Sequence, residues 1–314
     1  MNIKDNVQSL NQQIFLPILE EKNIELFIKR EDLIHPFVSG NKYRKLKYNL
    51  QKAKHLHKKV VLTFGGAFSN HIVATAVAAN TNGLQSIGVI RGDELENNIS
   101  NTLKNNSSLQ IAHQHGMIFH FVSRESYRNK TNPFFINQLQ QKYGDFYLIP
   151  EGGTNQLAIK GCEEILTNND AKFNYICCAV GTGGTIAGLI NSVKKHQKII
   201  GFSALKGDFL AQKILKLACK KNWHLQAEYH FGGYAKYSEE LIHFINTFKS
   251  KTDVLLDPIY TAKMMFGILD LVKTNTFAKS TKILAIHTGG IQAIDGFNKK
   301  LSNKNLEIIK SKSI

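Results

Sequence analysis

The sequence YICCAVGTGGTIAGLI at residues 175–190 decides the class of fold. Its first part is a short apolar run that predicts a buried strand over Tyr175–Val180. A turn of glycine and threonine follows at once and consists of Gly181, Thr182, Gly183, Gly184 and Thr185. The spacing of apolar residues then predicts a helix over 185–196. A strand that passes through a glycine turn into a helix is typical of α/β proteins with parallel strands, and this is the fold class we expect.

The same turn has the features of an anion-binding site. Backbone N–H groups flanked by glycine can approach a phosphate, the helix N-terminus adds the positive end of its dipole, and Thr182 and Thr185 can donate hydroxyl groups. The pattern is not a dinucleotide-binding fingerprint, because Ile186 stands at the third glycine position, and it is not a Walker loop, because no lysine follows. A monophosphate ester is the favoured ligand. A tight turn that needs glycine only for packing is the alternative.

Strand and helix patterns alternate along most of the chain around this unit. Further strands are expected at 60–65, 86–91, 117–123, 146–149, 198–204 and 282–287. Helical spacing is present over 43–57, 208–222, 238–250, 262–273 and 291–301. This alternation predicts parallel strands joined by crossover helices. The best candidate for a crossing between two lobes is the glycine pair in EGGTN at 151–155.

Composition excludes several classes of protein. With 314 residues and 43% apolar content, the chain can bury a large core. No apolar run reaches membrane-spanning length and the N-terminus has no signal-peptide pattern, so we expect a cytoplasmic protein with no membrane partner. The cysteines show no CxxC spacing, which favours buried free thiols, and we expect no metal site.

A net charge of +16 raises the question of a nucleic-acid partner. The lysines are spread along the chain, and runs such as 54–59, 194–198 and 298–312 lack the interleaved aromatic residues that base stacking uses. We therefore expect a solvated basic surface and no nucleic-acid partner. An acidic substrate would still benefit from this charge.

A candidate catalytic lysine lies in SGNKYRKL at residues 39–46, where a turn of small residues leads into a helix. Lys42 stands at that junction. A lysine that forms a Schiff base must spend time as the neutral amine, and cations such as Arg44 and Lys45, or burial in a cleft, lower its pKa. A solvated residue at the start of a helix is the alternative, and on this segment alone it is the better interpretation.

Two further turns place polar residues at the ends of expected strands. In GGAFSNH at 65–71, Ser69 and Asn70 are expected at the N-cap of an alanine-rich helix, and capping alone explains both. In HTGG at 287–290, Thr288 offers a hydroxyl group after a strand. Ligands of α/β proteins bind at this edge of the sheet, so a capping role and a binding role can coexist.

Two tyrosines stand beside turn residues late in the chain. Tyr234 ends FGGY at 231–234, and Tyr260 lies in DPIYT at 257–261. Either phenol can transfer a proton if a nearby cation lowers its pKa. A structural role is the better interpretation of each tyrosine taken singly.

Taken together and in this order, these segments resemble the fold-type II pyridoxal-phosphate enzymes, and within them the family of D-cysteine desulfhydrase and 1-aminocyclopropane-1-carboxylate deaminase. The similarity consists of GNKYRKL at 40–46, SN at 69–70, the glycine turn at 181–185, DPIY at 257–260 and HTGG at 287–290. It extends over nearly the whole chain. A chance match of five ordered motifs is far less probable than a match of one.

This resemblance implies an α/β fold like that of the tryptophan synthase β subunit, with two open, twisted, parallel-sheet domains and pyridoxal 5'-phosphate between them. Residues 1–44 plus 153–314 would form the large cofactor-binding domain, and residues 45–152 the small domain. The family also implies a homodimer and a small amino-acid substrate.

The resemblance also implies a role for each candidate residue. Lys42 would hold the cofactor and move the proton at the substrate α-carbon, Asn70 would bond the ring hydroxyl, and the 181–185 turn would hold the phosphate. Ser69 would meet the substrate carboxylate and transfer a proton. His71, Tyr234 and Tyr260 would contact the substrate. Thr261 and Thr288 would contact the pyridine ring of the cofactor.

Two activities of the family compete. The deaminases carry a glutamate after the DPxY tyrosine, which keeps the pyridine nitrogen protonated, whereas this chain has Thr261. Together with His71, which resembles the desulfhydrases, this favours β-elimination, in which a D-cysteine-like substrate yields pyruvate, ammonia and hydrogen sulfide. Deamination of 1-aminocyclopropane-1-carboxylate to 2-oxobutyrate is the alternative within the family. A non-catalytic protein that binds the cofactor or an amino acid is the alternative from another class, and the presence of both tyrosines argues against it.

Two residues depart from the family pattern around the SN pair. Phe68 and Val73 stand where many relatives carry glutamine and arginine. Recognition of the substrate carboxylate is therefore expected to differ from that in those relatives.

Overall fold

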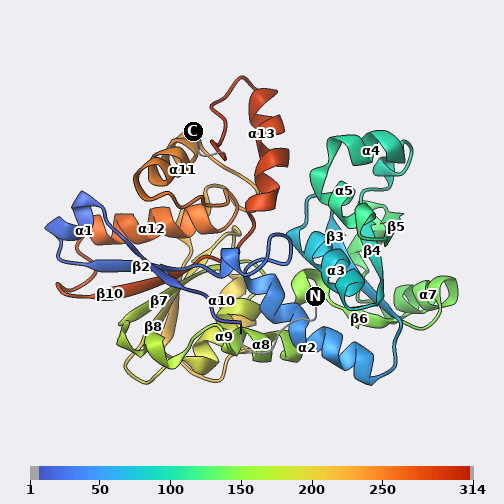
Figure 1. Ribbon diagram of the computed structural model, residues 1–314, viewed down its shortest axis with the longest axis horizontal. Helices are drawn as coiled ribbons and strands as arrows, with labels where there is room; N and C mark the ends of the chain where they lie inside the picture. Colours follow the sequence, from blue (N-terminus) through green and yellow to red (C-terminus); the bar gives the residue numbers. More distant parts are fainter. Residues whose placement is uncertain (1–6, 312–314) are drawn as a thin grey trace.

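The computed structural model describes residues 7–311 and contains two β-sheets, which lie side by side in Figure 1. The six-stranded sheet has the order β1-β2-β10-β7-β8-β9, and the four-stranded sheet has the order β5-β4-β3-β6. The strands are β1 (Asn11–Ile14), β2 (Glu25–Lys29), β3 (Val60–Gly66), β4 (Gln85–Arg91), β5 (Met117–Val122), β6 (Tyr147–Ile149), β7 (Tyr175–Val180), β8 (Lys198–Ser203), β9 (Trp223–Gln226) and β10 (Lys282–Ile286). The predicted α/β fold with two parallel sheets is confirmed. Its one exception among the described strands is β1, which pairs with β2 in the antiparallel direction.

Every strand predicted from the sequence is present, and β7 has the predicted bounds. The strands missed by the prediction are β1, β2 and β9. Both β1 (NQQI) and β9 (WHLQ) are polar edge strands of four residues, which are too short to show an apolar pattern.

The described α-helices connect the strands and cover the sheets. They are α1 (Pro17–Glu21), α2 (Asn41–His55), α3 (Asn70–Thr81), α4 (Ile99–Asn105), α5 (Ser107–Gln114), α6 (Arg124–Arg128), α7 (Pro133–Tyr143), α8 (Gln156–Glu163), α9 (Gly184–Ser192), α10 (Phe209–Leu215), α11 (Glu239–Thr252), α12 (Thr261–Lys273) and α13 (Ile294–Ser302). The helix predicted over 208–222 is wrong beyond Leu215, because the chain leaves the helix there to enter β9.

Strand β7 lies in the middle of the larger sheet and has apolar residues on both faces. Cys177 and Ala179 pack in the core under α11 and α12, whereas Cys178 and Val180 pack in the core under α9 and α10. Figure 1 shows these helix pairs on opposite sides of the sheet. A parallel strand covered on both faces is expected to be continuously apolar, which explains the run YICCAV. The prediction of buried thiols holds for Cys162, Cys177 and Cys178 but is wrong for Cys219, which is exposed.

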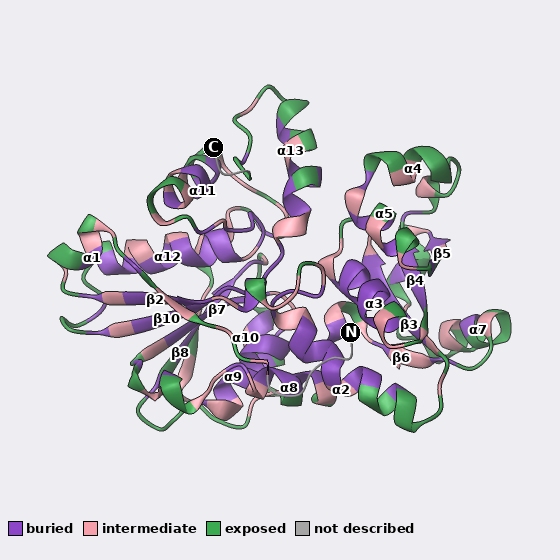
Figure 2. Cartoon of the chain, in the orientation of Figure 1, coloured by how far each residue is buried: buried purple, intermediate pink, exposed green. Residues whose placement is uncertain are grey.

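Helix α3 brings the SN pair to the edge of the smaller sheet. Its alanine-rich face is buried along most of its length, which Figure 2 shows in purple, because small side chains let the helix approach β3 and β4 closely. The strands of this sheet all lie between residues 60 and 149. The domain boundaries themselves, 1–44 plus 153–314 and 45–152, stay a prediction. No helix among residues 7–311 is both long and apolar enough to span a membrane.

A buried ion pair fixes the start of α2. The Arg44 guanidinium donates from Nε to Glu31 Oε2 at 2.9 Å and from Nη2 to Glu31 Oε1 at 2.8 Å. The side chains of Arg44 and Glu31 are 2% and 0% exposed. Two parallel hydrogen bonds of this kind give both energy and a fixed geometry.

We expect Glu31→Gln to lower the free energy of unfolding by about 3–5 kcal/mol, because it leaves the Arg44 cation buried without its carboxylate. Urea denaturation of the wild-type and variant proteins measures this difference. A matched control is Glu94→Gln, which removes a pair with Arg124 whose side chains are 55% and 75% exposed. That change is expected to cost less than about 1 kcal/mol. Equal effects of the two substitutions would contradict a structural role for the buried pair.

Candidate active site

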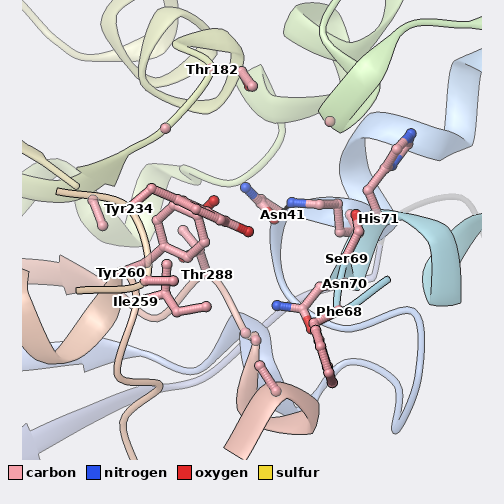
Figure 3. A pocket seen from close by; sticks show the side chains of 18 of the residues that line it. Asn41, Phe68, Ser69, Asn70, His71, Thr182, Tyr234, Ile259, Tyr260 and Thr288 are labelled. Carbon is pink, nitrogen blue, oxygen red and sulfur yellow. Dashed lines mark hydrogen bonds between the residues drawn. The ribbon is translucent and has the colours of Figure 1, made fainter. Parts of the chain in front are cut away.

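A cavity of about 720 Å³ lies where elements of the two sheets meet. Its walls come from the start of α2, the turn after β3, the end of β4, the turn after β7 and the segments around Tyr234, Tyr260 and Thr288. Figure 3 shows Tyr234, Tyr260 and Thr288 on one side of the cavity and Phe68, Ser69 and Asn70 on the other. A pocket of this size at the carboxyl ends of parallel strands is the usual place for a ligand in an α/β protein.

Most of the residues singled out from the sequence line this one cavity. They are Lys42, Ser69, Asn70, His71, Gly181, Thr182, Gly183, Thr185, Tyr234, Tyr260 and Thr288. Two predicted residues, Gly184 and Thr261, are not part of its lining. Because they line one cavity, these residues lie within reach of one ligand. Their individual roles stay proposals.

Thr261 is fully buried and is engaged by Asp257. Its hydroxyl donates to Asp257 Oδ2 at 2.8 Å and accepts from the Asp257 backbone N–H at 2.9 Å. The Asp257 carboxylate also accepts from the backbone N–H groups of Ile259, Tyr260 and Thr261. Thr261 therefore shapes the turn that presents Tyr260, and a direct contact with a ligand is not supported.

Lys42 lies in the first turn of α2, and Gly40 makes this position possible. Gly40 has φ +60°, and a Cβ there would lie 1.9 Å from the Thr288 carbonyl oxygen. The backbones of the two turns can therefore meet only if residue 40 is glycine. The Lys42 amine donates to Asn41 Oδ1 at 3.0 Å.

The surroundings of Lys42 favour a neutral amine. Burial, together with the positive charge of Lys45, lowers the pKa of Lys42 to about 7. Arg44, which we expected to contribute, is paired with Glu31 instead. An amine with this pKa is a nucleophile and a base near neutral pH.

The turn after β7 forms another part of the cavity wall and leads into α9. Gly183 has φ +87° and precedes the first residue of that helix. The Thr182 hydroxyl shares a 2.6 Å hydrogen bond with the hydroxyl of Thr154, and Thr185 Oγ1 accepts from Asn41 Nδ2 at 2.8 Å. This contact joins the turn to the residue that holds Lys42.

A buried cation that we did not predict as a site residue supports the same turn. The Lys45 amine donates to the Gly152 carbonyl oxygen at 2.9 Å, to Thr154 Oγ1 at 3.0 Å and to Thr182 Oγ1 at 3.4 Å. Burial lowers the pKa of Lys45. A bound anion on this turn would stabilise the protonated amine. The sequence signal was its spacing, because Lys45 lies one helical turn beyond Lys42.

The turn before α3 presents polar groups that are not used for capping. Ser69 is the N-cap residue of α3, but its side chain makes no capping hydrogen bond. Asn70 Oδ1 is buried and has no hydrogen-bond partner among residues 7–311. The alternative that capping alone explains the pair is therefore not supported for Ser69. Asn70 lines the cavity, and its buried amide oxygen leaves one hydrogen bond that a donor of a ligand can complete.

The residues that flank the SN pair have different positions. His71 is 2% exposed, its Nε2 lies 2.8 Å from Thr63 Oγ1, and burial together with Lys42 and Lys45 keeps the pKa of its imidazole well below 6.5. Phe68 is 37% exposed and lines the cavity, whereas Val73 is buried in the core beside α2. A residue at position 73 is thus unable to meet a ligand.

Tyr234 and Tyr260 form a pair of phenols. Their ring centroids are 6.2 Å apart in an edge-to-face arrangement, and each phenol influences the pKa of the other. Burial raises the pKa of both, that of Tyr260 well above 10. Our expectation of a cation that lowers the pKa is met only in part, because Arg91 has that effect on Tyr234 but burial outweighs it. Both phenols are therefore protonated near neutral pH and able to donate hydrogen bonds.

The 231–235 segment that carries Tyr234 is held by a second buried lysine. Lys263 in α12 donates to the carbonyl oxygens of His230 and Gly233, each at 2.8 Å. The segment contains positive φ angles at Phe231, Gly232, Gly233 and Ala235. Through these two hydrogen bonds Lys263 holds the segment against α12, the helix that begins just after Tyr260. Tyr234 and Tyr260 are thereby brought close to each other.

Comparison with known proteins shows which family has this arrangement. Residues 12–289 match the family model described as pyridoxal-phosphate dependent enzyme. The chain belongs to this family. It is an enzyme family whose members use pyridoxal phosphate as their cofactor, as the sequence motifs indicated.

The most similar relatives include proteins of both predicted activities. One relative is the bifunctional D-cysteine desulfhydrase/1-aminocyclopropane-1-carboxylate deaminase, mitochondrial, from Arabidopsis thaliana. The two sequences are 33% identical over 294 residues, and this match covers 85% of this chain and 72% of the relative. It is 31% identical over 307 residues to a putative 1-aminocyclopropane-1-carboxylate deaminase of Pyrococcus horikoshii, with 91% of each chain covered. Among solved structures, an ACC deaminase homologue has a TM-score of 0.80 at 29% identity and covers 95% of this chain and 94% of its own.

The lining residues fit pyridoxal phosphate. The cofactor carries a phosphate, an aldehyde and a ring hydroxyl, and the cavity offers a helix N-terminus with a glycine turn, the amine of Lys42 and the unpartnered oxygen of Asn70. No group of three or more potential metal ligands is present in the described part of the chain.

Proposed function

We propose that this enzyme removes the β-substituent and ammonia from a small amino acid, with D-cysteine as the model substrate. In that reaction cysteine and one water give pyruvate, ammonia and hydrogen sulfide. The observation that carries the proposal is that the Lys42 amine, the glycine turn and the Tyr234–Tyr260 pair line one cavity. The Arabidopsis relative, which bears the name of both activities, supports the choice of substrate class.

The residues of the cofactor site have distinct roles in this proposal. Lys42 holds the cofactor, and the turn at 181–185 binds its phosphate, with Lys45 supplying positive charge next to Thr182. Asn70 contacts the ring hydroxyl. Thr288, which is 8% exposed in the wall of the cavity, lies beside the ring.

The chemical steps need proton transfers at two positions. Bound pyridoxal phosphate supplies an electron sink for the negative charge that develops at the substrate α-carbon. The neutral Lys42 amine accepts the proton from that carbon, and Ser69 binds the substrate carboxylate and helps to transfer the proton. Tyr260, protonated because burial raises its pKa, donates to the departing sulfur, and Tyr234 orients it through the edge-to-face contact of the two rings.

The charge around the cavity favours elimination over opening of a cyclopropane ring. Among the described lining residues Glu151 is the only carboxylate, and it accepts from the Tyr127 hydroxyl at 2.6 Å. Asp257 is buried and occupied by backbone N–H groups. A hydroxyl such as that of Thr288 does not hold a proton on the pyridine nitrogen as a carboxylate does, and elimination of a good leaving group depends less on that proton.

The pH dependence of cofactor attachment gives a test of the Lys42 environment. We expect the rate at which cofactor-free protein takes up pyridoxal phosphate covalently to rise with pH and to reach half of its maximum near pH 7. The reason is that the amine is protonated below its pKa of about 7 and neutral above it. Stopped-flow absorbance over pH 6–10 measures this rate. A profile that still rises between pH 9 and 10 would indicate an ordinary solvated lysine.

A product assay tests the reaction itself. The purified holoenzyme is incubated with D-cysteine, L-cysteine, D-serine and 1-aminocyclopropane-1-carboxylate, and pyruvate, 2-oxobutyrate, ammonia and sulfide are measured. We expect pyruvate, ammonia and sulfide in equal amounts from D-cysteine. 2-Oxobutyrate from the cyclopropane substrate alone would support the deaminase alternative, and bound cofactor without any turnover would support the non-catalytic one. A homodimer and a cytoplasmic location remain part of the proposal; the homodimer rests on the family alone, and the location rests on the sequence pattern.

A further inference from the structure

The cavity has more positive charge than the proposed cofactor requires. Glu151 is the one carboxylate among its described lining residues, and this carboxylate also lies 3.3 Å from the Lys130 amine. The basic lining residues are Lys42, Lys45, Arg91, Lys213 and Lys300. A cavity with this imbalance attracts anions and raises their local concentration.

Apart from Lys42, these cations form two groups at different places in the cavity. Lys45 and Lys213 lie on the side of the glycine turn: the Lys45 amine donates to Thr182 Oγ1 at 3.4 Å, and Ile214, which follows Lys213, lies 3.6 Å from a Cβ placed on Gly183. That group is accounted for by the cofactor phosphate. The second group flanks the 66–69 turn: Arg91 stands at the end of β4 beside Gly66, and Lys300 of α13 lies 4.9 Å from the centre of the Phe68 ring. The phosphate does not explain this second group.

Arg91 has no ion-pair partner among the residues that the structure describes, although acidic groups are close in sequence and space. Its guanidinium lies 5.7 Å from the centre of the Tyr127 ring, and one of its nitrogens would be 3.6 Å from a Cβ placed on Gly66. Glu94, three residues along the chain, pairs with Arg124 instead. The aromatic face therefore positions the guanidinium without neutralising it.

The position of Arg91 also connects it to the phenol pair. Its positive charge acts on Tyr234, the residue proposed to face the substrate side chain. Ser69, proposed to meet the α-carboxylate, follows the same turn that Arg91 flanks. The guanidinium thus lines the cavity beside the turn that carries Ser69, where it can meet the side chain of an amino acid bound there.

We propose that Arg91 is a specificity-determining residue that selects amino-acid substrates whose side chain carries a negative charge, such as a carboxylate, a phosphate ester or a sulfonate. This inference rests on the proposed function, because it assumes an amino acid in the cavity. Lys300 adds to the same field from the other side of the 66–69 turn. A planar guanidinium binds the paired oxygens of such groups in a bidentate manner.

Aspartate and asparagine are the probes for this inference, because they have the same shape, differ in side-chain charge and have no β-leaving group. Binding of each enantiomer of both to the wild-type holoenzyme is measured by isothermal titration calorimetry at low and high salt. We expect aspartate to bind about tenfold more tightly than asparagine at low salt, and salt to reduce that ratio. In Arg91→Gln the ratio falls to about one. The matched control Arg124→Gln, which changes an exposed arginine outside the cavity, keeps the wild-type ratio.

Three results would overturn the inference. The first is equal binding of aspartate and asparagine to the wild-type enzyme. The second is a wild-type ratio in Arg91→Gln. The third is an equal loss of affinity for both ligands in that variant, since this would place the α-carboxylate on Arg91. If any of these results is found while D-cysteine is still turned over, only the inference about Arg91 is wrong and the proposed function stands. If the charge preference is found but no substrate is turned over, the proposed function is wrong and the binding site at Arg91 stands.

Discussion

Lys42→Ala is expected to lower turnover of the best substrate by at least about 100-fold and to abolish covalent attachment of the cofactor. The variant loses the amine that holds the cofactor and the base that accepts the α-proton, and a positioned acid or base contributes about 10²–10⁴ in rate. The visible absorbance of lysine-bound pyridoxal phosphate and the rate of keto-acid formation measure the two losses. The variant should still fold, because the Lys42 side chain is only partly buried and its one hydrogen bond described here is to the neighbouring Asn41.

A matched control lies in the same helix. Lys52 is an exposed residue of α2 and is not part of the cavity lining. Lys52→Ala should keep the absorbance and the activity of the wild type. If Lys42→Ala is as active as Lys52→Ala, the role of Lys42 in the account is wrong.

Tyr260→Phe is expected to lower kcat by about 100-fold or more while changing KM little. The substitution removes only the hydroxyl group, so the packing of the ring is kept and the proton donor for the leaving group is lost. The effect should be smaller for a substrate with a better leaving group, such as β-chloro-D-alanine, because chloride departs without a proton. Steady-state kinetics with the two substrates measure this difference.

The result for Tyr260 is compared with two other tyrosines. Tyr234→Phe should have a smaller effect, since Tyr234 is 48% exposed and acts through Tyr260. Tyr143→Phe, in α7 and outside the cavity lining, should behave as wild type. An unchanged kcat in Tyr260→Phe, or an equal loss for both substrates, would exclude proton donation to the leaving group.

Much of the fold could be predicted because the apolar pattern of a strand matches its burial in the sheet. In β7 the run YICCAV is apolar throughout, since helices cover both faces of that strand, and the glycine turn marks its end. The predicted strand therefore has the observed bounds. In β1 and β9, by contrast, the pairing comes from neighbours distant in sequence, and nothing local in NQQI or WHLQ indicates a strand.

The candidate site was predictable where a residue type and a turn together carry the chemistry. Lys42 and the glycine turn are of this kind. The role of Lys45 could not be predicted, because its amine donates to three acceptors that only the folded chain brings together. The same holds for Arg91, whose unpaired charge is visible only once Glu94 and Glu151 are found to have other partners. Thr261 shows the reverse case, in which a residue adjacent to a motif is turned toward Asp257 and away from the cavity.

The central claim is that one cofactor is held by the amine at position 42 while its phosphate lies on the turn that begins at Gly181. The most direct measurement is reduction of the wild-type holoenzyme with borohydride, followed by proteolysis and mass spectrometry of the pyridoxyl peptide. We expect the modified peptide to contain Lys42, and we expect substitution of Gly183 by a bulky residue to prevent the modification, because the φ of +87° at Gly183 disfavours any side chain there. A pyridoxyl group on another lysine of the cavity, such as Lys45 or Lys213, or modification that is unaffected by the change at Gly183, would contradict it.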